Sequence, residues 1–184
     1  MASTRSWEQA RRGAIRDALG IGVASGAYAL SFGAISITAG LSLVQTCALS
    51  VVMFTGASQF AFVGVVAAGG SPWAGAATAV LLGSRNALYG LRLSSLLNVR
   101  GPRRLTASHF VIDETTAMAI ARDNPAESRF AFWAAGLILF TLWNLGTLVG
   151  ALATQVLSQH CEAIGTCRPA AERRIGHVFG ERRC

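Results

Sequence analysis

Residues 54–60 read FTGASQF, and they lie inside a run from residue 18 to residue 84 that contains no Asp, Glu, Lys or Arg. A helix needs only about 20 apolar residues to cross a bilayer, so a run of this length predicts helices in a membrane. FTGASQF interrupts the apolar pattern, because three of its side chains form hydrogen bonds and Gly56 weakens a helix. The cost of placing these polar groups in a membrane has to be offset by a structural or functional role.

The composition also indicates a membrane protein. The chain of 184 residues is 52% hydrophobic, and its charged fraction of 14% is about half that of soluble domains. A secretory signal peptide does not explain the first apolar segment, because several segments of similar length follow it. We therefore expect an all-α, polytopic helical membrane protein with about five hydrophobic segments.

The positive charge flanks the apolar segments. A net charge of +7 raises the question of nucleic acid, but the arginines are not gathered on one polar domain with interleaved aromatic residues, so no nucleic-acid partner is expected. The distribution is instead typical of the positive-inside rule. One cluster precedes the first segment and one follows the third: Arg5, Arg11, Arg12 and Arg16, then Arg92, Arg100, Arg103 and Arg104.

The apolar segments divide the chain into a basic amphipathic N-terminal segment (1–17), a transmembrane helical domain (18–154) and a basic tail (155–184). The first apolar segment has small residues four apart, Gly22 to Gly26 and Ala29 to Gly33, a spacing that lets helix backbones approach closely. The five segments cover roughly residues 18–39, 43–68, 73–97, 105–121 and 130–154.

Charge bias constrains the second segment. If the first three segments each crossed once, the two arginine clusters would lie on opposite sides of the membrane, against the positive-inside rule. A second segment that enters and leaves on one side, as two half-helices broken near Gly56, puts both clusters on the same side. The alternative is an ordinary span whose polar residues face neighbouring helices.

The tail differs from the rest of the chain. It is basic and holds Cys161, Cys167 and Cys184 without a C-x-x-C pair, and the spacing of these residues and His177 is irregular, so no metal site is expected. We expect a disordered tail, or one altered by truncation or by a shift of reading frame. No nucleophile motif and no phosphate loop followed by Lys occurs, so we expect no enzyme, no catalytic residues and no cofactor.

Ionisable groups at bilayer depth mark a candidate pathway, because each costs roughly 2.5 to 3.5 kcal/mol to insert and usually faces a cavity. Arg85 and Tyr89 are four residues apart, on one helix face beside Asn86. An arginine there either binds a substrate carboxylate or forms a structural ion pair with Asp113 or Glu114.

Asp113 and Glu114 are adjacent, so on a helix their side chains point about 100° apart. One of them is therefore free to pair with Arg85 while the other cycles a proton. The alternative is a shallow segment with both acids solvated. His109 precedes Asp113 by four residues on the same predicted helix face, where it serves either a proton relay or simple packing.

These residues together resemble the AzlC family, the large membrane subunit of branched-chain amino-acid exporters. The resemblance covers roughly residues 10–150 and is carried by FTGASQF, by the block from Arg85 to Tyr89, and by the Asp113–Glu114 pair. Two departures concern the N-x-R-H pattern before the tyrosine, where Gly83 and Asn86 replace the Asn and the His, and the basic tail, where family members continue with apolar sequence.

The resemblance implies a multi-pass secondary transporter of the bacterial inner membrane that exports valine, leucine, isoleucine or similar amino acids with a small AzlD-type membrane partner. Asp113 and Glu114 are then expected to couple transport to protons. The alternatives are a non-transporting membrane scaffold and an inactive, truncated transporter. The expected substrate-binding residues are Gly56, Ser58, Gln59, Phe60, Arg85 and Tyr89, with Phe54 and Val63 beside them for an aliphatic side chain.

Overall fold

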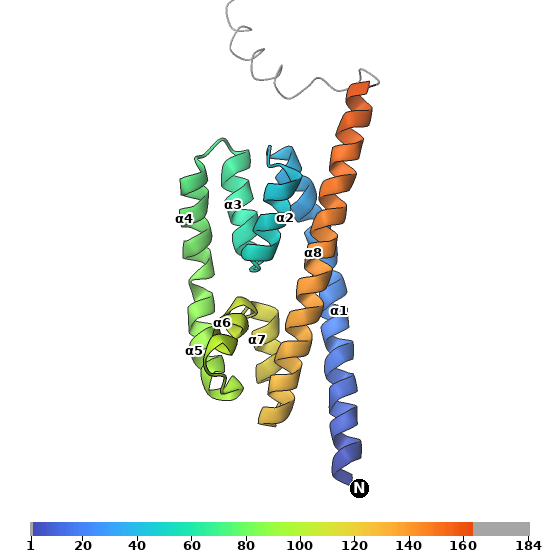
Figure 1. Ribbon diagram of the computed structural model, residues 1–184, viewed down its shortest axis with the longest axis vertical. Helices are drawn as coiled ribbons and strands as arrows, with labels where there is room; N and C mark the ends of the chain where they lie inside the picture. The colour runs from blue at the N-terminus through green and yellow to red at the C-terminus, as the bar shows by residue number, and fades with distance from the viewer. Residues whose placement is uncertain (1, 164–184) are drawn as a thin grey trace, which may run out of the picture.

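The computed structural model describes residues 2–163, and its regular structure there is entirely α-helical, as the sequence predicted (Figure 1). Two of these helices are long and apolar enough to cross a membrane, over residues 6–38 and 125–161. The helices are α1 (Ala2–Thr38), α2 (Leu43–Val52), α3 (Ala57–Ala67), α4 (Pro72–Gly83), α5 (Arg85–Leu97), α6 (Pro102–His109), α7 (Asp113–Ile120) and α8 (Pro125–Ala163).

Neither predicted region boundary coincides with a helix end. Helix α1 runs without a break through residue 17, and its N-terminal part packs on the start of α8, where the Arg11 guanidinium lies 4.9 Å from the centre of the Phe130 ring. Helix α8 continues past residue 154, so residues 155–163 are helical where we expected disorder. No glycine or proline interrupts this stretch, which explains the continuation. Cys167, His177 and Cys184 lie outside the described residues.

Close packing of α1 against α8 follows from the small-residue spacing of α1. A Cβ atom added to Gly33 would overlap the backbone of Thr147 and Ala151, and one added to Gly26 would lie 3.3 Å from the Leu142 carbonyl oxygen. A glycine of α8 makes the equivalent contact, since a Cβ atom added to Gly150 would overlap the backbone of Leu30. The two backbones touch directly, as the spacing predicted.

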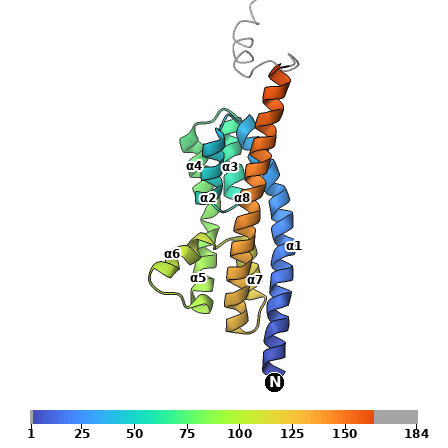
Figure 2. The ribbon, with the colours of Figure 1, turned by 45° about the vertical axis from the view of Figure 1, so that its right-hand side comes forward.

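The second apolar segment forms a helical hairpin. Its two helices lie in the upper half of the molecule, α3 beside α4 and α2 beside α8, with the connection at residues 53–56 pointing toward the middle (Figures 1 and 2). Ser42 starts α2 with reciprocal hydrogen bonds to Gln45, a capping box. The interruption predicted near Gly56 therefore separates two short helices.

The third and fourth apolar segments are each divided, where the sequence analysis treated them as single helices. Helices α4 and α5 follow one another end to end and break at Ser84, between Gly83 and Arg85 (Figure 1). Residues 105–121 contain a sharper break at residues 110–112, which turns α6 and α7 into a second hairpin. His109 and Asp113 consequently do not share one helix face, and that expectation was wrong.

The two hairpins point in opposite directions. The α2–α3 hairpin follows α1 and extends down from the upper end of the molecule, and the α6–α7 hairpin follows α4–α5 and extends up from the lower end (Figure 1). The N-terminal half of α1 and the end of α5 both lie at the lower end. Both arginine clusters therefore lie at the same end of the molecule, the arrangement expected if the second segment enters and leaves the membrane on one side.

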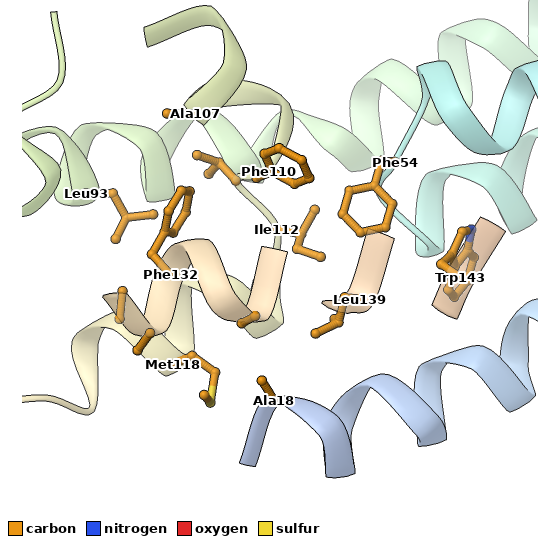
Figure 3. Close-up of a cluster of buried hydrophobic side chains, with 14 of the residues drawn as sticks. Ala18, Phe54, Leu93, Ala107, Phe110, Ile112, Met118, Phe132, Leu139 and Trp143 are labelled. Atoms are coloured by element: carbon orange, nitrogen blue, oxygen red, sulfur yellow. The ribbon is translucent and has the colours of Figure 1, made fainter. Parts of the chain in front are cut away.

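The tips of the two hairpins meet in a core of aromatic residues. Phe54 and Phe110, one from each connection, lie with ring centres 6.2 Å apart in an edge-to-face contact. Figure 3 shows them above Leu139 of α8, with Trp143 one turn further along the same helix. His109 packs within this cluster, 5.8 Å from Phe140, which supports its packing role. The core thus joins both hairpins to α8.

Candidate functional site

The α2–α3 tip, residues 53–56, takes its shape from Gly56 and Gln59. Gly56 has a φ of 56°, in the left-handed region that glycine adopts without strain. The Gln59 amide oxygen accepts a hydrogen bond from the Gly56 backbone N–H at 3.2 Å, and its NH₂ donates to the Leu49 carbonyl at 3.1 Å. Gln59 is fully buried and joins the two helices of the hairpin. This explains the glycine and the glutamine of FTGASQF.

The α6–α7 tip, residues 110–112, is built in the same way. The Thr115 hydroxyl accepts a hydrogen bond from the Ile112 backbone N–H at 3.1 Å and donates to the Phe110 carbonyl at 2.6 Å. In both tips, the third residue of the second helix bonds back to the N–H of the residue that precedes that helix. Helices α3 and α7 therefore begin at equivalent points near the middle of the molecule.

Removal of the Thr115 hydroxyl is expected to loosen the α6–α7 tip. Thr115→Val keeps the shape but leaves buried backbone groups unpaired, so we expect a loss of about 1 to 3 kcal/mol in the free energy of unfolding. Thr116→Val is the matched control, because the neighbouring Thr116 hydroxyl is buried with no hydrogen-bond partner and its removal is expected to cost little. Thermal unfolding in detergent compares the two, and equal midpoints would contradict the capping role.

An ion pair joins α5 to the start of α7. The Arg85 guanidinium lies 2.6 Å from one carboxylate oxygen of Asp113, with both side chains about half exposed. The Tyr89 hydroxyl, on the same face of α5, interacts with the same carboxylate. Of the two predicted partners of Arg85, the structure therefore selects Asp113. Glu114 forms no ion pair among the described residues.

A cavity of about 130 Å³ lies between the two tips. Ala57 and Asp113, the first residues of α3 and α7, both line this cavity. The first N–H groups of these two helices have no hydrogen-bond partner within their own helices. These helix N-termini also carry partial positive charge. The cavity is lined by residues of α1, both tips, the starts of α3 and α7, α5 and α8: Ser25, Phe54, Thr55, Gly56, Ala57, Arg85, Ile112, Asp113, Glu114, Leu139 and Trp143.

Three residues of this lining carry a buried polar atom with no hydrogen-bond partner. They are the Thr55 hydroxyl oxygen, the second Asp113 carboxylate oxygen and the Trp143 indole nitrogen. Trp143 is 7% exposed, and a buried unpaired donor costs about 1 to 3 kcal/mol. Such atoms are rare in native structures, and three of the six found among the described residues belong to residues that line this one cavity. This makes the cavity the candidate site for a polar ligand.

A second hollow of about 220 Å³ adjoins the first. The two share five lining residues, and the second adds the aromatic rings of Tyr28 and Phe60. The first hollow is therefore the more polar, with Arg85 and Asp113, and the second is mainly aromatic. The shared residues are Ser25, Gly56, Ala57, Glu114 and Trp143.

The predicted site residues separate into two groups. Gly56, Phe60, Arg85, Asp113 and Glu114 line the hollows, and Tyr89 interacts with Asp113. Ser58, Gln59 and Val63 do not line the hollows. Ser58 and Val63 are buried, with the Ser58 hydroxyl close to Gly83 of α4, and both ends of the Gln59 amide are bonded within the hairpin.

Ser25, Thr55 and Trp143 line the cavity, although the sequence did not predict them as site residues. Trp143 carried a usable signal, because tryptophans of membrane helices gather at the interfaces and this one lies mid-segment in the range 130–154. Ser25 is one small residue among many in α1 and had no such signal. Within residues 2–163 no group of three His, Cys, Asp or Glu side chains is arranged to hold a metal ion.

Comparison with known proteins identifies the family. The chain matches the model of the AzlC protein family over residues 20–157, three quarters of its length. It is 30% identical over 169 residues to the inner membrane protein YgaZ of Escherichia coli strain K12, in an alignment that covers 89% of this chain and 66% of that protein. The chain thus spans about two thirds of the length of this relative. No solved structure matches. The match over most of the chain confirms the resemblance carried by FTGASQF, and the chain is a membrane protein that belongs to the AzlC family.

Proposed function

We propose that this chain is the large subunit of a secondary transporter that exports branched-chain amino acids, and that the substrate binds between the two hairpin tips. The observation that carries the proposal is the cavity between the tips, three of whose lining residues each carry a buried polar atom with no hydrogen-bond partner. Helices that break at bilayer depth and turn their N-termini toward a central site are common in secondary transporters.

The two hollows suit the two parts of an aliphatic amino acid. The carboxylate takes the N-terminus of α3, with the Thr55 hydroxyl and the Trp143 N–H as donors. The aliphatic side chain takes the second hollow, against Phe60 and Tyr28. Gln59, which we expected to bind substrate, instead holds the tip in shape.

The membrane topology that fits this proposal has three crossings and two re-entrant hairpins. Helices α1, α4–α5 and α8 cross, and both arginine clusters face the cytoplasm in accord with the positive-inside rule. Each hairpin then enters from its own side, and the tips meet at mid-depth. Cysteine labelling tests this, because residues 10 and 102 must be accessible from the same side of the membrane.

An export assay tests the function. Cells that express the chain with a small subunit of the AzlD type are loaded with a valine-containing dipeptide, and valine release is measured. We expect Thr55→Val to reduce release about tenfold, the equivalent of one lost hydrogen bond of about 1.4 kcal/mol. Thr46→Val is the matched control, since the Thr46 hydroxyl is also buried and unpartnered but does not line the cavity.

Two outcomes count against the proposal. If wild-type chain is present in the membrane and releases no more valine than empty cells, the export function is wrong and a scaffold role gains support. If Thr55→Val and Thr46→Val behave alike, transport does not use the cavity between the tips.

A further inference from the structure

Glu114 is the second residue of α7 and lines both hollows of the site. It therefore lies between the polar hollow beside Arg85 and the aromatic hollow beside Phe60. A side chain in this position contacts any ligand that occupies both hollows together.

The charges around the site leave Glu114 uncompensated. The ion pair between Arg85 and Asp113 is neutral as a unit. The remaining titratable groups that face the hollows are the Tyr28 hydroxyl from α1 and, beside Asp113, the Tyr89 hydroxyl from α5; the linings from α3 and α8 contain no ionisable side chain. The empty site thus carries one net negative charge when Glu114 is ionised.

We propose that Glu114 binds the ammonium group of the amino acid and a proton alternately, so that substrate and proton exclude one another. This rests on the proposed function. A zwitterion adds one positive group beside Glu114, while its carboxylate reaches Thr55, Trp143 and the start of α3. The two charged ends of the substrate are then divided between the two hairpins.

The cost of an unpaired charge supplies the coupling. A lone carboxylate at bilayer depth is unfavourable by several kcal/mol, so the Glu114 carboxylate has to be paired or protonated before the site moves. Either the ammonium group or a proton on the Glu114 carboxylate achieves this. The substrate carboxylate that arrives with the ammonium group is compensated separately, by the partial positive charge at the start of α3. Release of the amino acid outside is followed by uptake of one proton there, which is delivered inside when the next amino acid binds. One proton enters for each amino acid exported.

Asp113 does not serve this role equally well. Protonation of Asp113 removes the partner of Arg85 and leaves a guanidinium uncompensated. Protonation of Glu114 leaves that ion pair intact. The ion pair therefore determines which of the two adjacent acids exchanges its proton.

The test is equilibrium binding to the full chain in lipid nanodiscs, with radiolabelled L-valine as the probe. As the pH falls through the range in which carboxyl groups protonate, we expect wild-type affinity to fall about tenfold per pH unit, the slope for competition by one proton. Glu114→Gln is expected to bind valine at least tenfold more weakly, with no pH dependence. Glu127→Gln is the matched control, because Glu127 also lies in the first turn of its helix but lines neither hollow.

A second probe separates the role of Glu114 from damage to the fold. Isovalerate is valine without the ammonium group, so Glu114→Gln, which removes a neighbouring negative charge, is expected to bind it at least as tightly as wild type. If Glu114→Gln retains the wild-type pH dependence for valine, or loses both valine and isovalerate, the inference is overturned. Failure of the wild-type chain to bind valine at any pH would instead contradict the proposed function itself.

Discussion

Gly33→Ala is expected to prevent α1 from packing against α8 and to abolish accumulation of folded protein in the membrane. The added Cβ would overlap the carbonyl oxygen of Thr147 and lie 2.7 Å from the backbone nitrogen of Ala151. Both are backbone atoms of a long helix, so neither can move aside without shifting α8. Overpacking of a tight contact costs about 1 to 3 kcal/mol and more when backbone must move.

Gly20→Ala is the matched control for this prediction. The same substitution in the same helix meets no atom within 4 Å, and alanine favours a helix over glycine by about 0.8 to 1 kcal/mol. Size-exclusion chromatography of detergent extracts, followed by thermal unfolding, compares the two variants. We expect Gly20→Ala to equal or exceed wild type and Gly33→Ala to be lost or aggregated. Equal stability of the two variants would show that α1 and α8 do not touch at Gly33.

Removal of one member of the Arg85–Asp113 ion pair is expected to cause the second largest loss of stability. Asp113→Ala leaves the Arg85 guanidinium unpaired and Arg85→Ala leaves a carboxylate unpaired, whereas the double variant removes both charges. A fully buried pair that loses one member typically costs about 3 to 5 kcal/mol. Because these side chains are about 40% exposed within the chain, we expect about 2 kcal/mol for each single variant, after allowance for screening.

A double-mutant cycle on thermal unfolding measures this coupling. The double variant is expected to be more stable than either single variant. Arg16 and Asp17 form the comparison pair, since their atoms are 3.6 Å apart and the Arg16 side chain is 85% exposed, so their coupling should stay below about 1 kcal/mol. Asp17 also pairs with Arg122 at 2.9 Å, and the cycle cancels this contribution because it is lost equally in the Asp17 variant and the double variant. Additive effects of the Arg85 and Asp113 substitutions would mean that the two side chains do not form a pair in the folded protein.

The breaks in the two hairpins differ in how well the sequence predicts them. The α2–α3 break was one of two alternatives that the sequence offered, because FTGASQF placed polar residues and a glycine in an apolar segment and the arginine clusters favoured an even number of crossings. The α6–α7 break carried no glycine. It depends on the Thr115 hydroxyl, which donates a hydrogen bond to the carbonyl five residues earlier. A threonine in the sequence does not by itself predict such a bond.

The site shows the same division. Arg85, Asp113 and Glu114 were identifiable as site residues because ionised groups are rare in apolar segments. The sequence left open which acid pairs with Arg85, because adjacent residues of a helix point about 100° apart and the direction of α7 was unknown. The packing of α7 beside α5 decided it in favour of Asp113.

Composition and segment length thus determined by themselves that this is a helical membrane protein. FTGASQF and the arginine positions favoured a broken second segment with both arginine clusters on one side, but left an ordinary span open. These properties depend on the chain's interaction with lipid and on local helix propensity, to which each residue contributes largely independently of distant residues. The tertiary structure alone decided that two hairpins meet tip to tip, that Trp143 and Thr55 face one cavity, and that Gln59 supports the tip. Those facts depend on contacts between residues far apart in the chain, and such contacts exist only once α1, both hairpins and α8 have packed together.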